Sequence, residues 1–227
     1  QAERLIFYSN ATYNMTRASA VKRLLEMAGP PYYQAFLVNS GSEANENAIK
    51  LARASTGRPE IISLSGSFHG RTYGSLSSTG ISKYRGYLKA PVPGHLILSP
   101  AEAAEAVSEN TAAVLIEPIQ SMAGVQEIPK ETLQEIHLAC KLNNTLLIFD
   151  EIQTGIARTG SFLYAGRGDV YPDLVSLAKG IASGFPCGAL LITEDLATTV
   201  RTGDLGSTFG GGPLNNYTMH GIARMGE

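Results

Sequence analysis

Apolar and polar residues follow two patterns along the chain, and these predict strands and helices in turn. Five short apolar runs, bounded by turn residues, have the length of strands buried on both faces of a parallel sheet. These runs cover residues 35–38, 61–64, 112–116, 146–149 and 174–178. Apolar residues at helical spacing cover residues 17–28, 44–57 and 129–144. This order predicts an α/β fold of three layers (α/β/α), with a mainly parallel sheet that carries helices on both faces.

Two of the predicted strands end on a charged residue. The strand over residues 146–149 leads into Asp150, and the strand over residues 174–178 leads into Lys179. Open α/β sheets bind ligands at the carboxyl ends of their strands, and an isolated buried charge is unfavourable. From these residues alone, Asp150 and Lys179 either face a ligand, or pair with each other or cap helices.

The segment Asn39-Ser40-Gly41-Ser42 joins a predicted strand to a predicted helix. A turn of small residues at a helix N-terminus leaves backbone N–H groups free, and the helix dipole adds positive potential, so the segment suits a phosphate group. Ser40 and Glu43 also have the spacing of a capping box. Many strand-to-helix turns of this composition bind nothing, so the segment alone fits a phosphate site or a plain turn.

A second loop, residues 66–74, is rich in glycine and carries Phe68, His69 and Arg71. An aromatic ring can stack on a flat heterocycle, and an arginine can hold a carboxylate by two parallel hydrogen bonds. For this loop alone, the residues favour a solvated turn with one buried ring over a binding loop.

The composition is that of an ordinary globular domain. Of 227 residues, 44% are hydrophobic and 17% are charged, with a formal net charge of −2. No basic cluster suggests a nucleic-acid partner, and no apolar run approaches the roughly 20 residues of a membrane span, so we expect neither partner. Cys140 and Cys187 lie among apolar residues, which favours buried thiols in a reducing compartment, either the cytoplasm or an organelle matrix.

Several other site types are excluded by missing motifs. An apolar run followed by Asp150-Glu151 also occurs in P-loop ATPases, but the chain has no Gly-x-x-x-x-Gly-Lys-Ser/Thr segment. It has no dinucleotide-binding Gly-x-Gly-x-x-Gly after a strand and no Gly-x-Ser-x-Gly nucleophile elbow. The four histidines are scattered without metal-ligand spacing, so no metal site is predicted.

Six segments, taken in order, resemble the class III aminotransferases, which use pyridoxal 5′-phosphate (PLP). They are Asn39-Ser-Gly-Ser-Glu-Ala-Asn-Glu, Ser67-Phe-His-Gly-Arg-Thr, Glu117-Pro-Ile-Gln, Asp150-Glu-Ile-Gln-Thr-Gly with Arg158-Thr-Gly, Leu177-Ala-Lys-Gly and Ser207-Thr-Phe-Gly-Gly. Within that family the resemblance is closest to the acetylornithine and ornithine aminotransferases. It implies the large domain of a fold-type I PLP-dependent transferase.

The resemblance implies a role for each cofactor-binding residue. Lys179, the catalytic residue, would hold PLP as a Schiff base and then carry the transferred proton. Asp150 would keep the ring nitrogen protonated. The remaining cofactor residues would grip the ring and the phosphate: Phe68 and Ile152 on the two faces of the ring, Gln153 on its hydroxyl, Gly41 and Ser42 on the phosphate, and Thr208 on the phosphate of a neighbouring subunit.

The resemblance also implies the substrates and the partner. Arg71 and Ser207 would bind the substrate, with Arg71 on a carboxylate, and Glu117 matches a family glutamate near the substrate. We expect a ping-pong exchange of an amino group between an N-acetylornithine-like or ornithine-like donor and 2-oxoglutarate, and a homodimer completed by Thr208. Another PLP reaction, such as decarboxylation, racemisation or a mutase reaction, and a catalytically incomplete PLP domain are the alternatives.

Two features depart from the family pattern. Relatives often read Glu-Pro-Ile-Gln-Gly-Glu where this chain reads Glu-Pro-Ile-Gln-Ser-Met, so Met122 replaces a glutamate that helps handle ω-amino substrates. The chain also begins at Gln1 and ends at Glu227, a few residues into a helix predicted after Pro213. We therefore expect residues 1–227 to form the PLP-binding large domain alone, without the N-terminal segment and C-terminal small domain of full-length relatives.

Overall fold

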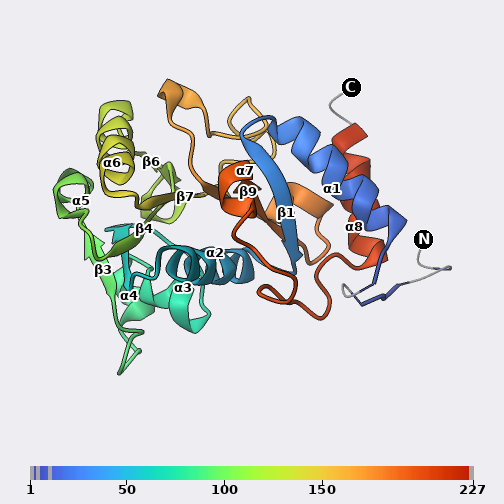
Figure 1. Ribbon diagram of the computed structural model, residues 1–227, viewed down its shortest axis with the longest axis horizontal. Helices are drawn as coiled ribbons and strands as arrows, with labels where there is room; N and C mark the ends of the chain where they lie inside the picture. Colours follow the sequence, from blue (N-terminus) through green and yellow to red (C-terminus); the bar gives the residue numbers. More distant parts are fainter. Residues whose placement is uncertain (1–2, 4–5, 10–11, 225–227) are drawn as a thin grey trace.

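The computed structural model describes residues 3, 6–9 and 12–224, and its centre is a seven-stranded sheet (Figure 1). The strands lie in the order β1-β9-β8-β7-β4-β2-β3. Their bounds are β1 Tyr32–Val38, β2 Glu60–Leu64, β3 His95–Leu98, β4 Thr111–Ile116, β7 Leu146–Asp150, β8 Leu174–Leu177 and β9 Gly188–Thr193. A separate two-stranded ribbon pairs β5 (Ile119–Gln120) with β6 (Gln126–Glu127).

Eight α-helices and three short 3-10 turns connect these strands in the described part of the chain. The α-helices are α1 Met15–Ala28, α2 Gly41–Thr56, α3 Tyr73–Ser77, α4 Ser82–Arg85, α5 Pro100–Ala106, α6 Lys130–Asn143, α7 Glu194–Ala197 and α8 Pro213–Arg224. The 3-10 turns are η1 Ser121–Ala123, η2 Arg167–Asp169 and η3 Lys179–Ala182. The helix predicted after Pro213 is thus confirmed as α8, while Gln1 and Glu227 lie outside the described residues.

The sheet is mainly parallel, as predicted. Strands β8, β7, β4, β2 and β3 pair in parallel, and only β9 runs antiparallel to both of its neighbours. Because β9 is reversed, β1 at the edge again points the same way as β8. The carboxyl ends of β1, β8, β7, β4 and β2 therefore meet along one edge of the sheet.

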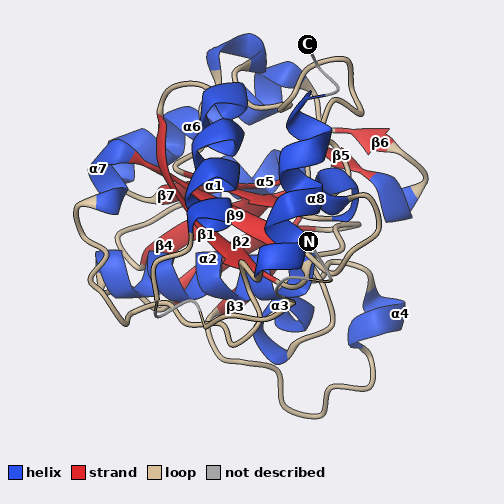
Figure 2. Cartoon of the chain, turned by 90° about the vertical axis from the view of Figure 1, so that its right-hand side faces the viewer, coloured by secondary structure: helices blue, strands red, loops and turns tan. Residues whose placement is uncertain are grey.

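Alternate residues of each strand enter two separate hydrophobic clusters, which demonstrates the three layers. In β7, Leu147 and Phe149 pack in the cluster that contains α1, α5, α6 and α8 residues. Ile148, between them, packs in the cluster of α2 and α7 residues on the opposite face. This two-sided burial explains why the strand sequences are continuous apolar runs. Figure 2 shows the strands enclosed by helices on both sides.

The helix that leads into the site is stabilised at both ends. Ser40 caps α2 by accepting a hydrogen bond from the backbone N–H of Glu43, at 3.2 Å. The Glu43 carboxylate accepts from the backbone N–H of Asn39 at 3.1 Å, one residue earlier than a standard capping box would use. Gly57 ends the helix in the left-handed conformation. The N-terminus of α2 is thereby fixed at the carboxyl end of β1.

The cysteines and the helices agree with two features of the composition. Cys140 and Cys187 are both free thiols and are 1% and 3% exposed, as predicted. Among the described residues, no helix has both the length and the apolar composition of a membrane-spanning segment.

Candidate active site

A cavity of about 750 Å³ opens at the edge of the sheet where the parallel strands end. Eight of the ten residues predicted for the site line this one cavity: Gly41, Ser42, Phe68, Arg71, Asp150, Ile152, Gln153 and Lys179. They come from four segments that are far apart in the sequence, namely the β1–α2 turn, the loop after β2, and the ends of β7 and β8. The remaining two residues, Ser207 and Thr208, lie elsewhere.

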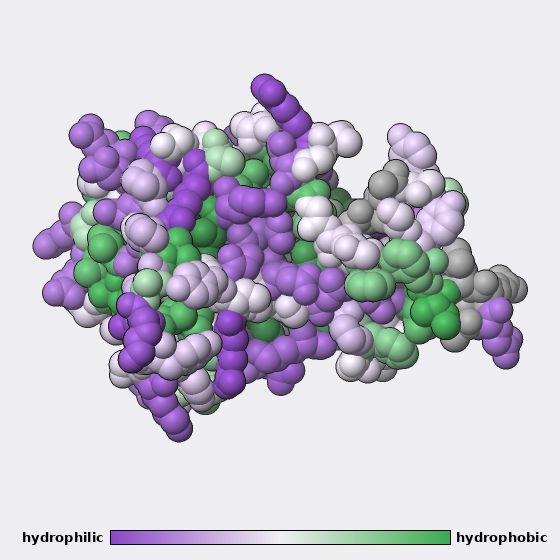
Figure 3. Space-filling view, turned by 90° about the horizontal axis from the view of Figure 1, so that it is seen from below, coloured by the Kyte–Doolittle hydropathy of each residue, from purple (hydrophilic) through white to green (hydrophobic). Residues whose placement is uncertain are grey.

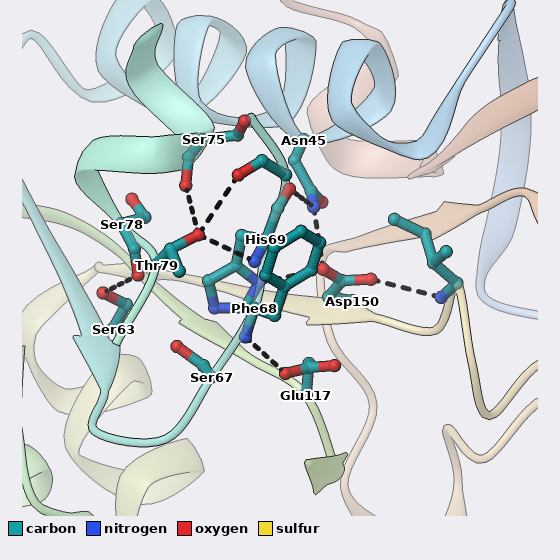
Figure 4. Close-up of polar contacts among 12 residues, drawn as sticks. Asn45, Ser63, Ser67, Phe68, His69, Ser75, Ser78, Thr79, Glu117 and Asp150 are labelled. Atoms are coloured by element: carbon teal, nitrogen blue, oxygen red, sulfur yellow. Dashed lines mark hydrogen bonds and ion pairs between the residues drawn. The ribbon is translucent and has the colours of Figure 1, made fainter. Parts of the chain in front are cut away.

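Asp150 ends β7 and is buried, at 2% exposure. Its Oδ2 atom accepts hydrogen bonds from Asn45 Nδ2 at 2.7 Å and from the His69 ring at 2.8 Å (Figure 4). Its Oδ1 atom accepts from the backbone N–H of Ile152 at 3.2 Å. These bonds fix the orientation of the carboxylate from α2, from the loop after β2 and from its own turn. Within the described residues, no ion pair joins Asp150 to Lys179, so the alternative that the two residues pair with each other is wrong.

Lys179 lies just after β8, the strand next to β7 in the sheet. It is three residues beyond Ser176, and Ser176 pairs with Asp150. Its backbone has φ = 49°, in the left-handed region that lysine rarely adopts. Burial lowers the pKa of Lys179, although Asp150 and Glu117 act in the opposite direction. Lys179 lines the cavity and is exposed, so the structure presents an accessible amine there.

The N-terminus of α2 faces the same cavity. Among the described residues, no acceptor takes the backbone N–H groups of Gly41 and Ser42, the first two residues of the helix. The Ser42 hydroxyl is already engaged, because it accepts from the backbone N–H groups of Arg71 and Thr72 at 3.0 and 3.1 Å. It also bonds to the hydroxyl groups of Thr72 and Ser75, each at 2.9 Å. The free donors at this end are therefore backbone groups, and the Ser42 side chain fastens the neighbouring loop.

Gly41 is required by close packing at the cavity wall. A Cβ atom at this position would lie 2.3 Å from Cδ1 of Ile152. Glycine thus allows the first turn of α2 and the Ile152 side chain to border the same space. Phe68 and Gln153 complete this part of the wall.

Glu117 lies at the end of β4 and is also buried, at 3% exposure. Its Oε2 atom accepts a 2.6 Å hydrogen bond from the backbone N–H of Phe68 and so holds the loop that carries this ring. Burial, and secondly the proximity of Asp150, raise the pKa of Glu117 to about 8. Burial therefore favours the protonated form of this carboxyl group.

The raised pKa of Glu117 predicts how stability depends on pH. A carboxyl group with a pKa near 4.5 when unfolded and about 8 when folded binds its proton more tightly in the folded state. Its stabilising contribution is present below pH 4.5 and is lost as the pH rises through 8. We expect Glu117→Gln to raise the free energy of unfolding at pH 8 by on the order of 3 kcal/mol and to change it little at pH 5. Urea unfolding of the ligand-free chain at both pH values measures this, and an equal effect at the two pH values would contradict it.

Three other positions were predicted to bear on the reaction. Met122 lines the cavity and is 47% exposed, so a neutral thioether forms part of its wall. The Ser207 hydroxyl does not line the cavity; it accepts from Asn39 Nδ2 at 3.1 Å, and Asn39 is a lining residue. Thr208 is exposed on the loop before α8. The roles assigned to Ser207 and Thr208 remain predictions.

Sequence reasoning missed the two residues that orient Asp150. Asn45 is fully buried and also donates to the backbone carbonyl of His69 at 2.7 Å. Its position on the buried stripe of α2, between Ala44 and Ala48, is the signal that could have identified it, because a polar residue there requires a partner. His69 was recognised only as part of its loop. In the described residues, no group of three or more potential metal-binding side chains is found.

Comparison with known proteins identifies the family of the chain. The family model for class-III aminotransferases matches residues 1–225. The acetylornithine aminotransferase of Methanopyrus kandleri is 44% identical over 217 residues, covering 94% of this chain and 56% of that protein. The mitochondrial acetylornithine aminotransferase of Alnus glutinosa is 42% identical over 228 residues, covering 94% of this chain and 50% of that protein. The chain spans about half the length of these relatives.

Solved structures show the same architecture. The ornithine aminotransferase of Toxoplasma gondii superposes with a TM-score of 0.89 at 32% identity, covering 100% of this chain and 57% of that one. The taurine:2-oxoglutarate aminotransferase of Bifidobacterium kashiwanohense, solved with PLP and glutamate, gives a TM-score of 0.88 at 28% identity, with 98% and 57% covered. The chain therefore belongs to the class-III aminotransferases, the PLP-dependent family that its sequence motifs predict.

Proposed function

We propose that this chain is the cofactor-binding part of an aminotransferase that moves an amino group from an N-acetylornithine-like or ornithine-like donor to 2-oxoglutarate. The observation that carries the proposal is the convergence of eight predicted residues on one cavity at the strand ends. The names of the relatives, acetylornithine and ornithine aminotransferases, support the choice of donor.

The residues of the cavity fit each part of PLP. The unpaired backbone N–H groups of Gly41 and Ser42 suit its phosphate, since they lie at the positive end of the α2 dipole. Phe68 and Ile152 supply apolar surface for its ring, and Asp150 supplies an oriented carboxylate for its ring nitrogen. Lys179 supplies the amine for its aldehyde carbon.

When bound, PLP supplies a ring that withdraws electrons from the substrate carbon. The chain contributes the groups that control this chemistry. Asp150, held by Asn45 and His69, would keep a proton on the ring nitrogen, because its carboxylate would stabilise the positive charge there. Lys179, whose pKa is lowered by burial, would hold the aldehyde carbon of the cofactor and would move a proton at the substrate carbon.

Arg71 is proposed to hold a carboxylate of the substrate, because this exposed arginine lines the cavity. We expect Arg71→Ala to raise KM for 2-oxoglutarate about ten- to a hundredfold, with a smaller change in kcat, since two charge-assisted hydrogen bonds are lost. Arg71→Lys keeps the positive charge but not the geometry for two parallel hydrogen bonds. Its KM should therefore lie between those of the unchanged chain and of Arg71→Ala. Steady-state kinetics measures both parameters, and an unchanged KM in Arg71→Ala would remove Arg71 from the site.

A second copy of the chain is proposed to complete the site through Thr208. Thr208 is exposed, and its neighbour Phe209 is 61% exposed and contacts the Phe7 ring, 46% exposed, at a centroid distance of 5.2 Å. Figure 3 shows apolar side chains, in green, gathered toward the right-hand end of the molecule. Exposed apolar surface of this kind often marks an interface.

The reaction is tested by following the products with and without 2-oxoglutarate. We expect the donor to lose its amino group, and glutamate to form, only when the keto acid is present. Carbon dioxide release or racemisation without the keto acid would instead indicate a different PLP reaction. Failure to bind PLP at all would refute the proposal.

A further inference from the structure

Tyr84, in the single turn α4, contacts two residues of the cavity at once. Its ring lies edge-on to the Phe68 ring, with centroids 5.3 Å apart and an interplanar angle of 74°. The guanidinium carbon of Arg71 lies 5.1 Å from the centre of the same Tyr84 ring. Tyr84 itself does not line the cavity. It therefore stands behind both the proposed ring-stacking residue and the proposed carboxylate-binding residue.

The backbone holds Tyr84 close to the loop that carries these residues. The carbonyl of Ser67, which directly precedes Phe68, accepts from the backbone N–H groups of Gly80 and Ile81 at 2.8 and 3.3 Å. Ile81 in turn accepts from the backbone N–H of Tyr84 at 3.1 Å and so begins the α4 turn. The position of Tyr84 is thus coupled to that of Phe68 through three hydrogen bonds.

Gly80 makes this close approach possible. A Cβ atom at Gly80 would lie 2.2 Å from the backbone carbonyl oxygen of Leu64 and 2.8 Å from the backbone nitrogen of Gly66. Any other residue would push the segment after it away from the end of β2. The chain therefore brings the α4 turn against the loop at a site that only glycine allows.

We propose that Tyr84 is a positioning residue that sets the tilt of the Phe68 ring and the direction of the Arg71 guanidinium group. Edge-to-face aromatic pairs favour one mutual orientation, and an arginine over an aromatic face is attracted to the ring electrons. The Tyr84 side chain thereby orients both the Phe68 ring that would stack on the cofactor and the Arg71 group that would bind a substrate carboxylate. The carboxylate part of this inference rests on the proposed function of Arg71.

The test compares Tyr84→Leu, which removes the ring, with Tyr84→Phe, which keeps it. The Tyr84 hydroxyl group makes no hydrogen bond to any described residue, so the ring is the part at issue. Tyr87→Leu, three residues away and 70% exposed, is the matched control. Tyr84→Met fills similar space without a ring and serves if Tyr84→Leu does not fold.

Two readouts separate positioning from folding. We expect Tyr84→Leu to raise the dissociation constant for PLP, measured by absorbance titration of the chain, about two- to tenfold. We expect it to raise KM for 2-oxoglutarate about two- to fivefold with little change in kcat. In an Arg71→Ala background the effect on KM should disappear, while the effect on PLP binding should persist. Tyr84→Phe and Tyr87→Leu should match the unchanged chain in both.

Two outcomes would overturn the inference. Equal PLP affinity and equal KM in Tyr84→Leu, with or without lower stability, would make Tyr84 a purely structural residue. A Tyr84→Phe variant that behaves like Tyr84→Leu would show that the ring is not the active part. These results differ from a failure of the proposed function, in which the unchanged chain itself would not bind PLP saturably.

Discussion

Replacing Lys179 by alanine is expected to abolish covalent attachment of PLP and to lower turnover by at least about a thousandfold, since the same amine serves as nucleophile and proton carrier. The cavity keeps its phosphate donors and its apolar walls, so PLP should still bind, with weaker affinity. The absorbance of bound PLP and the steady-state rate measure the two effects separately.

Two further variants sharpen this test. Lys179→Arg keeps a positive charge but offers no nucleophilic amine, so it should be as inactive as Lys179→Ala. Lys22→Ala removes an exposed lysine of α1, 79% exposed and outside the cavity, and should leave both measurements unchanged. Covalent attachment of PLP and turnover that both persist in Lys179→Ala would contradict the assignment.

Asp150→Asn is expected to leave PLP bound and to lower kcat about a hundred- to a thousandfold, because a neutral amide no longer stabilises a proton on the ring nitrogen. The amide oxygen can still accept the hydrogen bonds from Asn45 and His69, and only the 3.2 Å bond from the backbone N–H of Ile152 is lost, so the surrounding fold should persist. Single-turnover measurements on the PLP-loaded chain isolate this step. A rate close to that of the unchanged chain would refute the role of Asp150.

Glu151→Gln provides the matched control for Asp150→Asn. Glu151 is the next residue and is equally buried, at 1% exposure, but it does not line the cavity. Its carboxylate instead accepts from the backbone N–H groups of Tyr164 and Ala165 at 2.6 and 2.7 Å, which fastens the loop after β7. Its neutralisation should therefore leave turnover unchanged, although both substitutions remove one buried carboxylate.

The layers of the fold and most of the site follow from local sequence. The apolar runs that end on Asp150 and Lys179 are strands β7 and β8, and their parallel pairing places both residues at one edge. The predicted helices agree with α1, α2 and α6 to within about three residues, which is ordinary variation at helix ends. Periodicity was sufficient here because each element buries a continuous apolar face.

Other features depend on contacts between distant segments. The sequence of β9, Gly188–Thr193, is apolar, but nothing within it fixes that it runs antiparallel between β1 and β8. The partners of Asp150 come from residues 81 and 105 positions away. The Ser42 hydroxyl appeared available for a phosphate, yet the loop over residues 71–75 occupies it. Such pairings are decided by tertiary packing and leave little local signal.

The central claim, that Lys179 binds PLP in the cavity at the strand ends, is tested most directly by chemical trapping. The 227-residue chain is saturated with PLP, reduced with sodium borohydride to make the bond permanent, and digested for peptide mass mapping. We predict one stoichiometric adduct, on the peptide that contains Lys179, and none in the Lys179→Ala variant. Stoichiometric labelling of a different lysine, or no adduct at saturating PLP, would contradict the claim.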